Sequence, residues 1–103
     1  MRRRVLVIDD DPAVCLLVSA MLEPANYEVQ GAAAGEPGEV LASKQLPDLI
    51  LLDLQMPGMG GYQVLKLLRQ GEKTARIPVV MLTASDDPAL NRKAYAAGAS
   101  ACV

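Results

Sequence analysis

Three short and almost uninterrupted apolar runs constrain the fold of this chain more than any other feature. They occupy residues 5–8 (VLVI), 49–52 (LILL) and 77–82 (IPVVML). A strand with one face in water alternates apolar and polar residues, whereas an unbroken apolar run is typical of a strand that is buried on both faces. Pro78 is acceptable because it stands near the start of its run. These segments therefore predict the inner strands of a sheet that helices cover on both sides.

The segments between these runs have helical periodicity. Pro12 suits the first position of a helix, and Pro24 cannot continue one. Between them, apolar residues recur at intervals of three and four, so they share one helical face. That face comprises Val14, Leu17, Val18, Met21 and Leu22. Similar reasoning predicts three more helices, over residues 36–45, from 61 to about 71, and from Pro88 to 98, the last capped by Asp86 or Asp87.

A weaker strand at 27–29, nearer an edge of the sheet, and a strand that begins at residue 101 complete the pattern. The resulting order, β-α-β-α-β-α-β-α-β, predicts an α/β fold in which five parallel strands form a doubly wound sheet. A chain of 103 residues is long enough for one hydrophobic core, so we expect a single domain. In such sheets, ligands bind beyond the carboxyl ends of the strands.

Composition excludes several classes of protein. The net charge of −2 and the pI of about 5.0 offer no basic surface for nucleic acid or an anionic membrane. No segment reaches the roughly 18 apolar residues of a membrane span, and the apolar block behind the arginines at 2–4 is too short for a secretory signal. We therefore expect a cytoplasmic protein. With no His, Cys15 and Cys102 do not suggest a zinc site or a Cys–His catalytic pair.

Acidic and hydroxyl residues follow the three apolar runs. Asp9, Asp10 and Asp11 come after the first run, Asp53 after the second and Thr83 after the third. If the strands are neighbours, these side chains converge, and carboxylates that close repel one another until a proton or a cation binds. Ligands that are all oxygen favour Mg²⁺, with Mn²⁺ as a substitute. An aspartate beside Mg²⁺ can attack phosphorus to form an aspartyl phosphate, and a threonine hydroxyl can bind the phosphoryl group.

Each of these residues also has a simpler explanation when it is taken alone. An acidic run after a strand is usually a solvated loop that caps the next helix, and a lone threonine there is usually a turn residue. Their occurrence together at matching strand ends favours a site.

Four segments resemble the receiver domains of two-component response regulators. They follow the order of that family from one end of the chain to the other, at 5–12 (VLVIDDDP), 47–65 (PDLILLDLQMPGMGGYQVL), 77–84 (IPVVMLTA) and 94–103 (AYAAGASACV). The resemblance implies a flavodoxin-like fold with strand order 2-1-3-4-5. It also implies a phosphorylation-dependent switch whose partners are a sensor histidine kinase or a phosphotransfer protein and an output domain. Such a domain is no enzyme, although it assists its own phosphorylation and dephosphorylation, and it binds neither nucleic acid nor membrane directly.

The resemblance also implies roles for individual residues. Asp53 would be the phosphoacceptor. Asp10 and Asp53 would bind Mg²⁺ directly, together with the backbone carbonyl of Gln55, and Asp9 would hold the ion through water. Thr83 resembles the switch hydroxyl that moves toward the phosphoryl group.

The chain departs from the family pattern near its end. The lysine that contacts the phosphoryl group and the final helix would both come after Val103, so the resemblance implies that residues 1–103 form a C-terminally incomplete receiver domain. The missing helix would leave one sheet face uncovered, which favours self-association through that face. Cys102 stands where the family usually has Tyr or Phe, an aromatic residue that follows Thr83 in the switch.

Two other functions remain as alternatives. The first is a receiver fold that is used only for protein contacts and is independent of phosphate; the missing lysine favours it, and the complete set of aspartates opposes it. The second is a Mg²⁺-dependent phosphatase of the haloacid dehalogenase type. That enzyme needs a second aspartate two residues after the nucleophile, where this chain has Gln55.

Overall fold

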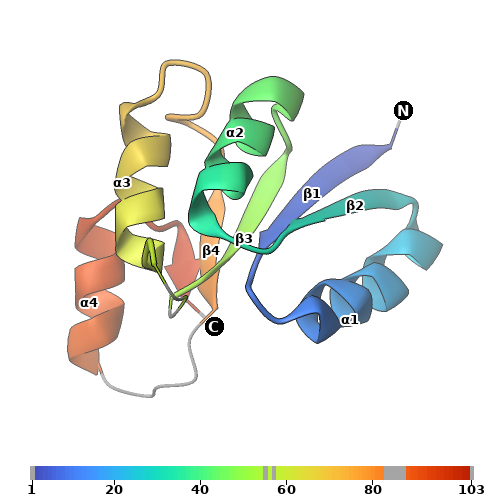
Figure 1. Ribbon diagram of the computed structural model, residues 1–103, viewed down its shortest axis with the longest axis horizontal. Helices are drawn as coiled ribbons and strands as arrows, with labels where there is room; N and C mark the ends of the chain where they lie inside the picture. The colour runs from blue at the N-terminus through green and yellow to red at the C-terminus, as the bar shows by residue number, and fades with distance from the viewer. Residues whose placement is uncertain (1, 55, 57, 83–87, 103) are drawn as a thin grey trace.

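The computed structural model describes residues 2–54, 56, 58–82 and 88–102. Five parallel strands form one sheet in the order β2-β1-β3-β4-β5 (Figure 1). The strands are β1 (Arg3–Ile8), β2 (Tyr27–Ala32), β3 (Leu49–Asp53), β4 (Val79–Leu82) and β5 (Ala101–Cys102). The helices are α1 (Pro12–Leu22), the short 3₁₀ helix η1 (Glu23–Ala25), α2 (Gly35–Gln45), α3 (Gly61–Gln70) and α4 (Pro88–Ala96). The predicted α/β fold, parallel sheet and strand order are confirmed.

Local hydrogen bonds explain where the elements differ in length from the prediction. Strand β2 continues to Ala32, beyond the predicted 27–29, because it pairs with β1 along all six residues. Strand β4 begins at Val79, two residues after the start of the predicted run 77–82. The backbone amide of Ile77 donates to the carbonyl oxygen of Thr74 at 3.1 Å, so Ile77 belongs to the preceding turn. Asp86 and Asp87, the expected caps of α4, lie outside the described residues.

Helices α2, α3 and α4 pack on one face of the sheet. Alternate residues of the inner strands form this core together with apolar residues of the three helices. From the strands come Leu6, Ile8, Ile50, Leu52, Val79 and Met81, each at most 3% exposed. From the helices come Ala42, Val64, Leu65, Leu68 and Ala94. The strands that lead to the functional edge are thus held rigidly from this side.

Helix α1 packs on the opposite face, near β2, and its burial differs from the prediction. A side chain added at Gly31 of β2 would meet Cys15 of α1, whereas the next residue, Ala32, belongs to the core on the other face. None of the eleven residues of α1, all of them described, is buried. Leu17 and Met21 are 62% and 67% exposed. The predicted apolar face is therefore turned only partly toward the sheet: Val14, Val18 and Leu22 are half-buried, whereas Leu17 and Met21 are exposed.

Among the described residues, no helix has the length and the apolar character to cross a lipid bilayer.

Candidate functional site

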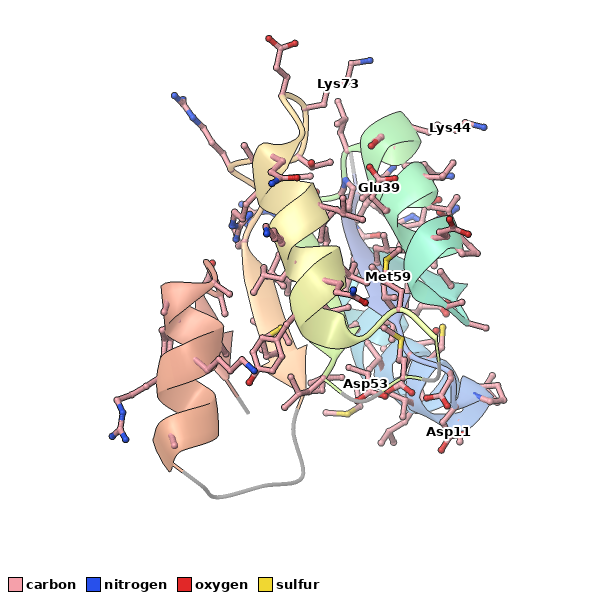
Figure 2. The ribbon with its side chains drawn as sticks, turned by 60° about the vertical axis from the view of Figure 1, so that its left-hand side comes forward. Asp11, Glu39, Lys44, Asp53, Met59 and Lys73 are labelled. Atoms are coloured by element: carbon pink, nitrogen blue, oxygen red, sulfur yellow. The ribbon has the colours of Figure 1, made fainter. Side chains whose placement is uncertain are left out.

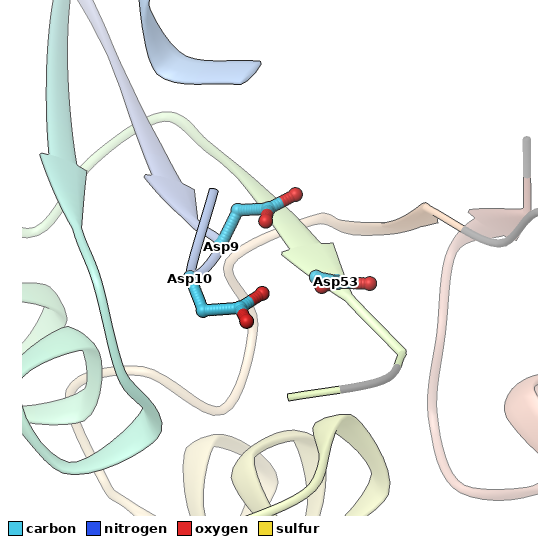
Figure 3. A group of neighbouring side chains, drawn as sticks. All are labelled: Asp9, Asp10 and Asp53. Atoms are coloured by element: carbon cyan, nitrogen blue, oxygen red, sulfur yellow. The ribbon is translucent and has the colours of Figure 1, made fainter. Parts of the chain in front are cut away.

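Three carboxylates meet at the carboxyl edge of the sheet. Ile8 and Leu52 are paired in the neighbouring strands β1 and β3, so the chain places Asp9 and Asp53 side by side where the strands end. Asp10 follows, and its side chain points into the same space (Figure 3). One carboxylate oxygen from each aspartate lies within 4.8 Å of the other two. The structure therefore brings together the three aspartates that the sequence proposed as a metal site.

Asp9 also organises the loop that carries the other two residues of the acidic run. Its backbone amide donates to the carbonyl of Ala32 at the end of β2, at 3.0 Å. Its Oδ1 accepts from the backbone amide of Asp11 at 2.9 Å. One carboxylate oxygen of Asp9 is thus engaged by the loop, which leaves the other for a ligand or a water molecule.

Asp11 caps the first helix and does not face Asp53. Its Oδ1 accepts from the backbone amide of Ala13 at 3.0 Å, which makes it the N-cap of α1. Pro12 occupies the first helical position. An N–H at this position has no acceptor within the helix, so proline, which lacks the N–H, costs the helix no hydrogen bond. Asp11 is not among the three clustered aspartates. The capping contact explains why only two aspartates of the run turn toward Asp53.

The segment after Asp53 is anchored on both sides of the strand end. The amide of Leu54 donates to the carbonyl of Leu82 in β4, and the amide of Gly61 donates to the carbonyl of Leu54, both at 3.1 Å. The side chains of Leu54 and Met56 are buried in the core. These contacts fix the backbone of Asp53 while its half-buried carboxylate stays at the edge of the sheet.

Gly61 contributes to the site through its lack of a side chain, a role that sequence reasoning missed. A Cβ at this position would collide with the carbonyl oxygen of Asp53 and lie 2.8 Å from the Cα of Leu54. Helix α3 can therefore begin directly against the strand end only because residue 61 is glycine. The adjacent pair Gly60-Gly61 was the available signal, although the pattern alone does not tell which glycine makes the close approach.

The acidic site lies far from several of the basic side chains. Figure 2 shows Asp53 and Asp11 at one end of the molecule and Lys44 and Lys73 at the opposite end. Three carboxylates this close repel one another, and a bound cation relieves that repulsion. Their donor atoms are all oxygen, which fits a hard divalent ion such as Mg²⁺.

Two of the predicted site residues, Gln55 and Thr83, lie outside the described residues. The described part of β4 ends at Leu82, which pairs with Asp53.

Comparison with known proteins decides the family. A family model described as the response regulator receiver domain matches residues 5–103. This chain belongs to the response regulator receiver domain family.

Relatives of this receiver domain include longer regulators. The DNA-binding dual master transcriptional regulator RpaA of Synechocystis is 54% identical over 81 residues, which cover 79% of this chain and 34% of that protein. The response regulator PleD of Caulobacter vibrioides is 44% identical over 86 residues, which cover 84% of this chain and 19% of that protein. The matched segments thus make up about a third of RpaA and about a fifth of PleD.

Solved structures share the fold. The chemotaxis protein CheY4 of Vibrio cholerae has a TM-score of 0.94 and 32% identity, over 100% of this chain and 86% of that one. The receiver domain of sensor histidine kinase PA1611 from Pseudomonas aeruginosa has a TM-score of 0.89 and 27% identity, over 100% of this chain and 84% of that one. The latter structure contains a magnesium ion coordinated in its active site cleft.

Proposed function

We propose that this receiver domain is a phosphorylation-dependent switch in which Asp53 accepts a phosphoryl group from a sensor histidine kinase or a phosphotransfer protein. The observation that carries the proposal is the convergence of Asp9, Asp10 and Asp53 within 4.8 Å at the ends of two buried strands. Membership of the receiver family supports it.

The reaction is a phosphoryl transfer to a carboxylate. An oxygen of Asp53 forms a bond to phosphorus while the bond between phosphorus and the donor atom breaks, and the electron pair of that bond leaves with the donor. The buried residues Ile50 and Leu52 hold the strand, so that Asp53 is positioned before the phosphodonor arrives.

The same cluster would hold Mg²⁺, or Mn²⁺ in its place. Asp10 and Asp53 would bind the ion directly with the backbone carbonyl of Gln55, and Asp9, whose other oxygen binds the loop, would hold it through water. When bound, the ion offsets the negative charge of the aspartates and of the transferring phosphoryl group.

The experiment that tests the proposal is mass measurement of the intact chain after incubation with acetyl phosphate. With Mg²⁺ present, the chain should gain the mass of one phosphoryl group, and removal of the metal with a chelator should suppress that gain. If no mass is gained with Mg²⁺ or Mn²⁺, the chain is better explained as a receiver fold that serves protein contacts only.

Asp10 and Asp11 should differ in their effects on metal binding. Asp10→Ala removes a carboxylate of the cluster, so we expect the affinity for Mg²⁺ to fall by at least about tenfold. Asp11→Ala removes the N-cap of α1, so it should lower the free energy of unfolding by about 1 kcal/mol while the Mg²⁺ affinity stays close to that of the unmodified chain. Calorimetric Mg²⁺ titrations and urea unfolding measure the two effects. Equal losses of metal affinity would contradict this division of roles.

Thr83 is proposed to bind the phosphoryl group rather than to supply the nucleophile. Thr83→Ala should therefore still gain a phosphoryl group, but the structural response should be lost. We expect the amide chemical-shift changes that beryllofluoride, a phosphoryl mimic, causes in α4 to be much smaller in this variant. Ser85→Ala, which removes a hydroxyl two residues away, serves as the control. Undiminished changes in Thr83→Ala would exclude the role.

Partners and location follow from the same proposal. RpaA is named a DNA-binding regulator, and this chain matches only 34% of its length. DNA contact would therefore belong to an output domain, and not to this acidic domain with its net charge of −2. We place the domain in the cytoplasm, where it would meet its kinase.

A further inference from the structure

Helix α4 runs from the edge of the sheet that holds the acidic site toward the opposite edge (Figure 1). It follows β4 in the chain, and Leu82, the last residue of β4, pairs with Asp53. Beyond the far end of α4, the amide of Ser100 donates to the carbonyl of Val79, the first residue of β4, at 2.8 Å. A displacement at the acidic site therefore reaches the first turn of α4 before its last turn.

The carboxyl end of α4 is anchored by Arg69, which lies in the last turn of α3. The Nε of Arg69 donates to the carbonyl of Gly98 at 2.9 Å. Its Nη1 donates to the carbonyl of Ile77 at 2.8 Å and to that of Ala75 at 3.2 Å, both in the turn before β4. One half-buried guanidinium thus fastens the loop after α4 to α3 and to the start of β4. We call these three hydrogen bonds the Arg69 anchor.

The backbone at the end of α4 is shaped for this anchor. The amides of Gly98 and Ala99 donate to the carbonyls of Tyr95 and Ala94, both at 3.0 Å, and Gly98 has a φ of +109°. This is a helix ending that favours glycine. A Cβ at Gly98 would also lie 2.9 Å from the Cγ of Arg69. The close approach of Arg69 to the loop therefore depends on a residue without a side chain.

A second contact joins α4 to α3 nearer the acidic site. The Nζ of Lys93 lies 4.7 Å from the centroid of the Tyr62 ring. Tyr62 follows Gly61, whose backbone lies against the carbonyl of Asp53, so this contact is at the site end of α3. Lys93 is exposed, and a cation–π contact at an exposed site is worth about half of one hydrogen bond from a charged donor, or less. Of the two attachments, the stronger one is therefore the one far from the site.

We propose that α4 pivots about the Arg69 anchor when a phosphoryl group occupies the acidic site, and that the Lys93–Tyr62 contact breaks in this motion. The inference rests on the proposed function of Asp53. Because a helix moves nearly as a rigid rod, a displacement of its first turn is taken up at the weaker attachment, while the anchor stays closed. The Lys93–Tyr62 contact then opposes the switch by its own free energy.

NMR of the Lys93 side chain tests whether the contact breaks. In the free chain, the ring current of Tyr62 should shift the ε-methylene proton signals of Lys93 upfield. Beryllofluoride with Mg²⁺ should move these signals to the position that they have in Tyr62→Leu, which lacks the ring. The backbone amides in the first turns of α4 should respond to beryllofluoride, whereas those of residues 97–100 should change little.

Lys93→Gln should tighten the binding of beryllofluoride by about two- to fivefold, because the contact no longer has to be broken. The matched control is Arg92→Gln, which removes the same charge from the neighbouring exposed residue of α4. Loss of a positive charge alone should weaken the binding of this anion slightly, so the effect expected for Lys93→Gln has the opposite sign.

Arg69→Gln tests the anchor. In this variant the amide response to beryllofluoride should extend to residues 97–100. Arg76→Gln, at an exposed residue in the turn before β4, should keep the response of the unmodified chain. Circular dichroism checks that the variants are folded. If Arg69→Gln does not fold, Arg69→Lys gives the same test, since lysine keeps the charge but not the planar fork of donors.

The possible failures are distinguishable. If the amide of Asp53 responds to beryllofluoride but the Lys93 signals do not move, the pivot is wrong and the proposed phosphoacceptor stands. If nothing responds at Asp53, both are wrong. Weaker binding in Lys93→Gln, as in Arg92→Gln, would contradict a contact that opposes the switch. An unchanged response at residues 97–100 in the Arg69 variants would exclude Arg69 as the anchor.

Discussion

Asp53→Asn should reduce the transfer of a phosphoryl group from acetyl phosphate to less than about a hundredth of that in the unmodified chain, because an amide oxygen is a poor nucleophile toward phosphorus. The substitution conserves the size of the side chain, so the packing of β3 between β1 and β4 should not change. It also removes one of the three negative charges of the cluster, which should weaken Mg²⁺ binding. Mass measurement of the intact chain gives the fraction phosphorylated.

The control for this prediction is Asp11→Asn. It makes the same chemical change close to the site, but Asp11 is the N-cap of α1 and not a member of the cluster. Asparagine caps helices about as well as aspartate, so stability should be preserved. We expect this variant to be phosphorylated like the unmodified chain. If both variants are phosphorylated normally, Asp53 is not the phosphoacceptor.

Gly61→Ala should lower the free energy of unfolding by about 2 kcal/mol or more, an effect in the range of overpacked cores. The added methyl group would collide with backbone atoms of Asp53 and Leu54, and backbone cannot move aside as the end of a flexible side chain can. Strand β3 or the start of α3 would have to shift. Because Asp53 carries the acidic site, the affinity for Mg²⁺ should fall as well.

Gly60→Ala is the matched control, one residue away. A Cβ at Gly60 meets no atom within 4 Å, and its φ of −74° suits any residue. The substitution should change stability by no more than about 1 kcal/mol, because alanine restricts the unfolded chain but suits the N-cap of α3 less well than glycine. Urea unfolding of the two variants measures the difference. Equal stabilities would show that α3 does not depend on the close approach at Gly61.

Much of the fold was predictable because local patterns encode it. The run LILL is apolar at every position, which indicated an inner strand with Asp53 at the sheet edge behind it; in the structure Ile50 and Leu52 are buried and the other face of the strand is half-buried. Pro12 after an aspartate indicated where α1 begins. To predict that Asp53 lies beside Asp9 and Asp10, one must also know that β1 and β3 are neighbours in the sheet. Strand order is not a local property, and here it came from the resemblance to a family.

Other features were decided only by tertiary structure. The acidic run contains three identical side chains; the family resemblance had separated Asp9 and Asp10 from Asp11, but the physical reason is the turn after β1, which directs Asp9 and Asp10 toward Asp53 while Asp11 caps α1. Gly60 and Gly61 are equivalent as sequence, but only Gly61 lies against the strand end.

The exposure of Leu17 and Met21 is the clearest example of a feature that only the tertiary structure decides. Helix α1 is apolar on every side, so its sequence does not indicate which side faces the sheet. Periodicity can assign a buried face only when a polar face contrasts with it. For α1, the buried face is determined by where β1 and β2 lie and by how far the helix reaches across them. Local sequence determines which residues can be buried, but burial itself depends on what the rest of the chain places against them.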